Sequence, residues 1–218
     1  MITAGSVLEE LNVNLFDHEE FDKAKLLHQR ENLLIWGGSS GVGSYIIQLA
    51  KVAGFKKIIT VATLKHTDFL HKIGATHVLD RFKSKEELIK DLKEIVPEGL
   101  QIGIDVVGKE TTDTVIEFLN VNKVENEAKT FVGVVTKPSK DLGSKLLENI
   151  EVKQVLIKKF HENLKFGENL VAKTWELLSN EQIKPQKNLK IYKGFEGILN
   201  GLKDLEKFGA SNEKYIVE

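Results

Sequence analysis

Residues 33–54 combine a short apolar run, a turn rich in glycine and serine, and an amphipathic segment, in that order. This order predicts a strand that ends in a tight turn and leads directly into a helix. The first amides of such a helix lack carbonyl partners and lie at the positive end of its dipole. The turn therefore suits a phosphate group, and the corner is typical of a parallel α/β sheet.

The turn departs at one position from the dinucleotide-binding pattern Gly-x-Gly-x-x-Gly. Gly38, Ser40 and Gly43 stand at the three pattern positions, so a serine replaces the middle glycine. A serine still permits close backbone approach, and its hydroxyl can donate to a phosphate oxygen. The alternative is an ordinary corner whose small residues serve packing alone, but the flanking strand and helix favour nucleotide binding. The residues predicted to form this cradle are Gly38, Ser39, Ser40, Gly41, Val42 and Gly43.

Composition narrows the class of protein. The chain has 218 residues, a net charge of −1 and no cysteine. Near-neutral charge argues against a nucleic-acid surface, and we find neither a membrane-length apolar run nor a signal peptide. We therefore expect a cytoplasmic protein without nucleic-acid or membrane partners. The histidine spacing fits no metal and no nucleophile–base group is visible, so we predict no metal ligand and no catalytic residue.

Predicted strands and helices alternate over residues 33–135. The strands are expected at 33–36, 57–62, 77–79, 101–107 and 129–135, with helices between them. The helix at 84–95 begins with a capping-box pattern, Ser84 followed by Glu87. This alternation predicts a Rossmann-like, doubly wound parallel sheet. Further elements are expected as helices at 5–15, 169–178 and 197–208 and as strands at 151–157 and 214–217.

The residues after the second predicted strand indicate which nucleotide the turn prefers. Chains that bind NAD usually place an acidic residue there, about 20 residues past the glycine turn. This chain instead has Thr63, Lys65 and His66, with no acidic residue before Asp68. A hydroxyl and a cation suit a phosphate monoester, which favours NADP(H). The alternative is a solvated lysine after a strand.

Two residues at the ends of later strands are candidates for the same site. Asp105 lies near the end of the fourth predicted strand, and a structural role is favoured for it. Gly133 lies in the fifth strand, where it allows the close approach of a nicotinamide ring. Simple packing explains Gly133 equally well.

Several segments resemble one known family. Residues 37–51 are similar to the cofactor turn of the medium-chain dehydrogenase/reductase superfamily, in its zinc-independent quinone-oxidoreductase and trans-enoyl-reductase branch of fungal type. Segments 59–66, 70–80, 103–108 and 197–218 resemble further parts of that family, so the likeness spans nearly the whole chain. The resemblance implies NADPH-dependent hydride transfer to an activated C=C or C=O of a small-molecule substrate. A non-catalytic nucleotide-binding or interaction module is the alternative.

The resemblance also implies an organisation in three parts. Residues 1–32 form a leading helix and surface connection, 33–190 the NADP-binding Rossmann domain, and 191–218 a remnant. In the family that remnant returns to a GroES-like catalytic domain. No part of the sequence matches that domain, so we expect a truncated chain with little activity alone. Family members often pair through a sheet edge, and segment 151–157 is the candidate edge for a homodimer.

Overall fold

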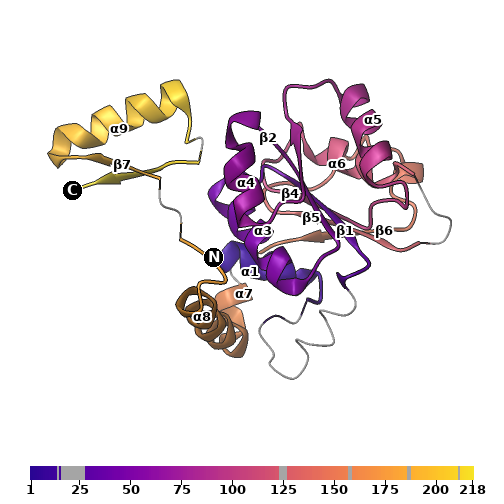
Figure 1. Cartoon of the computed structure of the whole chain (residues 1–218), viewed down its shortest axis with the longest axis horizontal. Coiled ribbons are helices and arrows are strands. Elements are labelled where there is room, and N and C mark those ends of the chain that lie inside the picture. The colour runs from indigo at the N-terminus through magenta and orange to yellow at the C-terminus, as the bar shows by residue number, and fades with distance from the viewer. Residues whose placement is uncertain (14, 16–27, 123–126, 157–158, 186–187, 211) are drawn as a thin grey trace.

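The computed structural model describes residues 1–13, 15, 28–122, 127–156, 159–185, 188–210 and 212–218. Six strands form one sheet in the order β3-β2-β1-β4-β5-β6 (Figure 1). All five strand pairs are parallel. The strands are β1 (Asn32–Trp36), β2 (Lys57–Ala62), β3 (His77–Asp80), β4 (Ile102–Asp105), β5 (Lys129–Gly133) and β6 (Ile150–Gln154). The chain runs outward from β1 to β3 and then returns to β4, which confirms the predicted doubly wound, Rossmann-like fold.

Helices cover both faces of the sheet. They are α1 (Ile2–Glu10), α3 (Gly41–Ala53), α4 (Thr67–Ile73), α5 (Lys85–Ile95), α6 (Thr112–Leu119), α7 (Lys159–Glu162) and α8 (Leu164–Ser179). Leu33 and Ile35 of β1 pack in one apolar cluster, with Leu49 of α3. Leu34 packs in the other cluster, with Phe118 of α6. The alternation along β1 therefore buries both of its faces, as expected of a central parallel strand.

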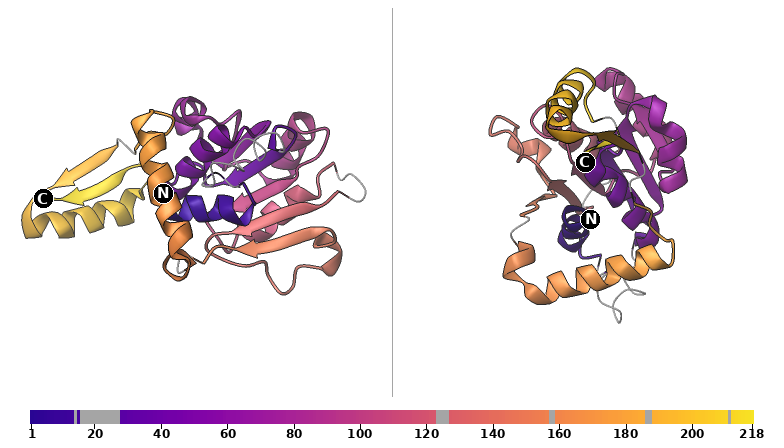
Figure 2. Two further views of the ribbon diagram at one scale, coloured as in Figure 1. Left: turned by 90° about the horizontal axis from the view of Figure 1, so that it is seen from below. Right: turned by 90° about the vertical axis from the view of Figure 1, so that its left-hand side faces the viewer.

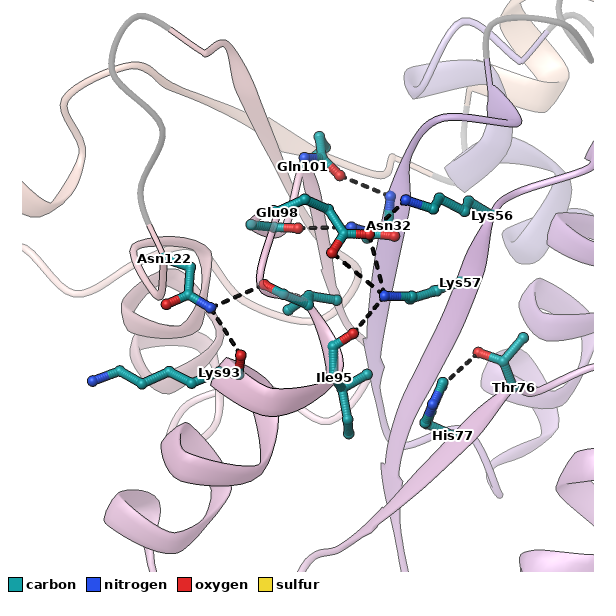
Figure 3. A network of polar contacts seen from close by, with 12 residues as sticks. Asn32, Lys56, Lys57, Thr76, His77, Lys93, Ile95, Glu98, Gln101 and Asn122 are labelled. Atoms are coloured by element: carbon teal, nitrogen blue, oxygen red, sulfur yellow. Dashed lines mark hydrogen bonds and ion pairs between the residues drawn. The ribbon is translucent and has the colours of Figure 1, made fainter.

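A polar network ties together the amino-terminal ends of the central strands (Figure 3). The buried Asn32 donates from its amide to the Gln101 side chain at 2.8 Å and from Nδ2 to the Gly99 carbonyl at 2.7 Å. Glu98 pairs with Lys56 at 2.6 Å and with Lys57 at 3.2 Å. The hydrogen bond from Lys56 lowers the pKa of the Glu98 carboxyl to about 2. This network lies at the edge opposite the glycine turn, so it serves the scaffold.

Some predicted boundaries are wrong. The helix expected at 5–15 is α1, which ends at Glu10, and Asn12 follows it with φ 56°. The strand expected at 101–107 ends at Asp105, because the Asp105 carboxylate accepts hydrogen bonds from the next amides and turns the chain. The strand expected at 151–157 is β6, which ends at Gln154, and residue 157 lies outside the described residues. Most of the leading connection, residues 16–27, also lies outside them.

The last part of the chain forms a small separate unit. β7 (Leu189–Tyr192) and β8 (Lys214–Val217) pair in parallel, and α9 (Gly194–Phe208) connects them. Sequence analysis missed β7, which lies in a polar stretch beyond Pro185. This C-terminal unit extends from one end of the molecule, away from the six-stranded sheet (Figures 1 and 2). None of the described helices is long and apolar enough to cross a membrane.

The corner between β1 and α3 predicts the first stability test. A Cβ on Gly43 would lie 2.3 Å from the Gly37 carbonyl oxygen. The oxygen belongs to the backbone and the Cβ is bonded to a backbone Cα, so neither atom can avoid the clash by a change of rotamer. Alanine is a better helix former than glycine, yet this clash should dominate, so we expect Gly43→Ala to lower the free energy of unfolding by about 1–3 kcal/mol. Urea unfolding followed by circular dichroism measures the loss. Gly143→Ala is the matched control, because no heavy atom lies within 4 Å of its added Cβ.

The predicted capping box of α5 is confirmed and gives a second test. The Glu87 amide donates to Ser84 Oγ at 3.2 Å, and the Ser84 amide donates to Glu87 Oε2 at 2.8 Å. We expect Ser84→Ala to lower the free energy of unfolding by about 1 kcal/mol, because one helical amide loses its acceptor. The same urea titration measures it. Lys90→Ala, exposed on the same helix, should leave the midpoint unchanged, and equal losses for both variants would contradict the capping argument.

Candidate functional site

The glycine turn presents the N-terminus of α3 at the carboxyl edge of the sheet. Gly37 takes φ +94° as the chain leaves β1, and the Ser40 amide donates to its carbonyl at 2.9 Å. Ser40 caps the helix, since its Oγ accepts from the Gly43 amide at 3.0 Å. The first helical hydrogen bond runs from the Ser44 amide to the Ser40 carbonyl. The amides of Gly41 and Val42 precede that bond and can therefore serve an anion.

Two glycines make this corner tight enough for the first helical amides to face an anion. A Cβ on Gly38 would lie 2.1 Å from Thr60 Oγ1, and the Gly38 amide donates to that oxygen at 3.1 Å. Thr60 Oγ1 in turn donates to the Ile35 carbonyl at 2.8 Å. Gly43 lets α3 approach the Gly37 carbonyl, as the sequence predicted for the last glycine of the pattern. Sequence analysis missed Thr60, because a threonine inside a buried strand gives no local signal.

A cavity of about 1070 Å³ opens in front of this turn. Ser39, Ser40 and Gly41 line it, together with Thr63 and Lys65, so the structure brings both predicted groups to one place. Gly38 and Gly43 are instead buried behind the surface of the turn. Val42 packs against the core cluster of α3. The two glycines and the Val42 side chain shape the cradle, and Val42 can contribute to an anion site only through its backbone amide.

Thr63 and Lys65 share a basic corner of the cavity with Arg81, which sequence analysis missed. Thr63 directly follows β2 and Arg81 directly follows β3, and Ala62 and Asp80 are partners in the parallel register. The Arg81 amide donates to the Ala62 carbonyl at 3.0 Å, which fixes the two strand ends side by side. The Arg81 guanidinium lies 4.6 Å from the Phe82 ring centroid. Residues 65 and 81 are distant in sequence, so only the pairing of β2 with β3 shows that they are neighbours.

His66 directly follows Lys65 but does not contribute to the cavity wall. It ends the short 3₁₀ turn that spans Leu64–His66. Burial, followed by the neighbouring charge of Lys65, lowers the pKa of His66. Its ring is therefore mostly neutral at pH 7, so Lys65 and Arg81 supply the positive charge.

Asp105 fixes the loop that forms the next wall. Its carboxylate is 1% exposed and accepts from the amides of Val107 at 2.9 Å and Gly108 at 3.1 Å. It also accepts from the hydroxyls of Thr111 at 2.9 Å and Thr112 at 2.6 Å. Val107, Thr111 and Glu110 from this loop line the cavity. Asp105 thus acts through the loop, which is the structural role that the sequence favoured.

Gly133 lies at the carboxyl end of β5 but does not line the cavity. A Cβ there would lie 2.2 Å from the Thr136 carbonyl oxygen. The space above this glycine is therefore filled by the chain's own turn, which favours the packing interpretation over close approach of a nicotinamide ring.

The C-terminal unit supplies the opposite wall of the cavity. The contributing segment follows α9 and runs into β8, and its lining residues are Phe208, Gly209, Ala210, Asn212, Glu213 and Lys214. Sequence analysis did not place this segment at the site, because only the fold brings residue 214 near residue 40. The cavity thus lies between the sheet edge and this unit.

Among the described residues, no three His, Asp or Glu side chains come together as ligands, and the sequence contains no cysteine.

Comparisons with known proteins support the architecture. Residues 41–169 match the family model described as zinc-binding dehydrogenase. A crotonyl-CoA reductase of Streptomyces avermitilis is 34% identical over 96 residues, which are 42% of this chain and 21% of that protein. A trans-enoyl reductase of Aspergillus terreus is 34% identical over 73 residues, 34% of this chain and 23% of that protein.

A solved structure extends the likeness over more of the chain. It is a mycobacterial protein complexed with NADPH, with a TM-score of 0.68 and 19% identity over 89% of this chain and 58% of that one. The chain therefore matches about a fifth of the length of these curated relatives and little more than half of this structure. The family model covers more than half of the chain, and the glycine turn, the parallel strand order and the fold of the NADPH-bound structure agree with it. The chain belongs to the zinc-binding dehydrogenase family, within the medium-chain dehydrogenase/reductase superfamily.

Proposed function

We propose that this chain binds NADPH at the carboxyl edge of its sheet and acts in hydride transfer to an activated C=C or C=O of a small molecule. One observation carries the proposal: the N-terminus of α3 and the basic corner of Thr63, Lys65 and Arg81 open into the same cavity. The helix N-terminus suits the pyrophosphate, which NADPH shares with NADH, and the basic corner suits the 2′-phosphate, which distinguishes NADPH from NADH.

The pyrophosphate fits the glycine turn. The Gly41 and Val42 amides stand at the N-terminus of a helix of 13 residues, where the dipole favours negative charge. Ser40 Oγ accepts from the Gly43 amide, so its own proton is free to be donated to a phosphate oxygen. The serine that replaces the middle glycine of the pattern therefore adds a donor at this position.

The 2′-phosphate fits the basic corner. Arg81 offers a planar fork of donors, Lys65 a mobile charge and Thr63 a hydroxyl, and all three lie at adjacent strand ends. NADH would bring no phosphate to these cations, so binding it would leave them without an anionic partner. This difference is the physical basis for a preference for NADPH.

The chain's own residues bind the nucleotide and orient it for the reaction. When NADPH is bound, the nucleotide supplies the hydride. Asp105 holds the loop of Val107 and Thr111 against the cavity, and the segment around Asn212 closes the far side. Reduction of an activated double bond is supported by the names of the crotonyl-CoA reductase and trans-enoyl reductase relatives.

Cofactor binding is tested by thermal unfolding. We expect NADPH to raise Tm of the full chain, because a ligand that binds only the folded state stabilises it by RT ln(1 + [L]/Kd). NADH at the same concentration should raise Tm less. The pair 2′,5′-ADP and 5′-AMP differs only in the 2′-phosphate and therefore isolates its contribution. The binding proposal fails if no nucleotide shifts Tm, and the choice of NADPH fails if NADH stabilises equally.

The basic corner is tested by substitution. We expect Lys65→Ala and Arg81→Ala each to weaken NADPH binding by about tenfold or more, because each removes a charge-assisted hydrogen bond worth roughly 1.5–3 kcal/mol. Isothermal titration calorimetry measures Kd, and NADH binding should change little. Lys72→Ala is the matched control, since Lys72 is exposed on α4 and does not line the cavity. Equal effects on NADPH and NADH would contradict the assignment.

Oxidation of NADPH by crotonyl-CoA, followed by absorbance, tests hydride transfer separately.

A further inference from the structure

A second cavity, of about 310 Å³, opens between α1, the residues that follow β6 and the start of α8. Helix α1 lies next to α7 and α8 in the fold (Figures 1 and 2). Six of the residues that line this cavity are Ser6, Glu9, Glu10, Leu156, Glu162 and Phe166. None of these six lines the cavity in front of the glycine turn or belongs to the C-terminal unit, so we call this space the α1 cavity.

A buried hydroxyl group in the wall of the α1 cavity lacks a partner. Ser6 is 6% exposed, and its Oγ has no hydrogen-bond partner among the described residues. Leaving a buried polar atom unpaired costs free energy, so such an atom in a cavity wall points to a ligand. Ser6 precedes Glu9 and Glu10 by three and four residues, so the three side chains share one face of α1. All three line the cavity.

The end of α1 carries charges that oppose its helix dipole. Glu9 and Glu10 stand in the last turn of α1, and that turn contains no basic residue. The carboxyl end of a helix is negative and favours cations, so acidic side chains there are unfavourable unless a cation covers them. Lys153 Nζ donates to the Glu10 carbonyl at 2.6 Å and also lies 3.3 Å from the Glu151 carboxylate. Glu162 of α7 adds a third carboxylate to the cavity wall.

The α1 cavity also has apolar walls. Phe166 is 9% exposed and belongs to the core cluster of α3, whereas Leu156 is 43% exposed. A ligand that carries hydrocarbon gains from such walls, and a bare ion does not. The charges of the cavity therefore favour a cation, and its walls favour an organic one.

We propose that the α1 cavity binds an organic ammonium ion, as a site separate from that of the nucleotide. An ammonium group carries N–H donors and no acceptor, so it matches the Ser6 hydroxyl oxygen and the carboxylates of Glu9, Glu10 and Glu162. The hydrocarbon body of the ligand then lies against Leu156 and Phe166. A bound cation at this place also compensates the negative end of α1.

Isothermal titration calorimetry with 2-phenylethylamine tests the proposal on the full chain. We expect saturable binding of one amine per chain at pH 7. The alcohol 2-phenylethanol has the same ring without the charge, and we expect it to bind at least tenfold more weakly, because it forms no charge-assisted hydrogen bond. The proposal fails if the amine does not bind saturably at millimolar concentration, or if the alcohol binds equally well. Displacement of the amine by MgCl₂, but not by NaCl of equal ionic strength, would indicate a metal site and also overturn it.

Two neighbouring carboxylates provide a matched pair of variants. Glu162 and Glu168 are both exposed, but only Glu162 lines the α1 cavity. We expect Glu162→Gln to weaken 2-phenylethylamine binding by about fivefold, because it removes one exposed charge contact, and Glu168→Gln to leave Kd unchanged. Equal losses in both variants would mean that the amine responds to the general charge of this surface, which contradicts a site in the cavity.

Ser6→Ala separates binding from folding. We expect it to weaken 2-phenylethylamine binding by about fivefold, since one hydrogen bond to the ligand is lost. The urea midpoint of the ligand-free chain should not fall, because Ser6 Oγ has no partner there to lose. Unchanged amine binding, or a lower midpoint without weaker binding, contradicts the role given to Ser6. NADPH binding should be the same in all of these variants, so this proposal and the proposed function can fail independently.

Discussion

The contact between Gly43 and the Gly37 carbonyl determines how close α3 can come to the end of β1. Since Gly43 has no side chain, the first turn of the helix lies directly against the turn that precedes it. The Ser40 cap and the Thr60 bond to the Gly38 amide hold the same corner. The corner then directs the first helical amides toward the cavity, where an anion would meet both hydrogen-bond donors and the positive end of the helix dipole.

Much of the fold could be predicted because its signals are local. The apolar runs of β1 and β2 are each recognisable from a few consecutive residues. The same is true of the Ser84 cap of α5 and of Gly54, which ends α3 after Ala53. The ends of the strands were harder to predict. β4 stops at Asp105 because that side chain captures later amides, and nothing in the run of residues 101–107 shows this.

The candidate site was predicted only in part, because some of its residues have a local sequence signal and others do not. Ser39, Ser40, Thr63 and Lys65 follow strands in an obvious pattern and do line the cavity. Arg81 was missed because its place beside Thr63 follows from the pairing of β2 with β3. Gly133 was assigned to the ligand or to packing with equal weight, and only the position of the Thr136 carbonyl distinguishes the two.

The basic corner and the glycine turn are built from different strand ends. The turn belongs to β1 and α3, whereas Lys65 and Arg81 follow β2 and β3 near one margin of the sheet. The hydrogen bonds of the glycine turn join the Gly38 amide to Thr60 and the Gly43 amide to Ser40, and neither Lys65 nor Arg81 takes part in them, so substitutions at those two positions leave these bonds in place. The proposed selectivity for the 2′-phosphate thus lies in a part of the fold that can change independently of the glycine turn.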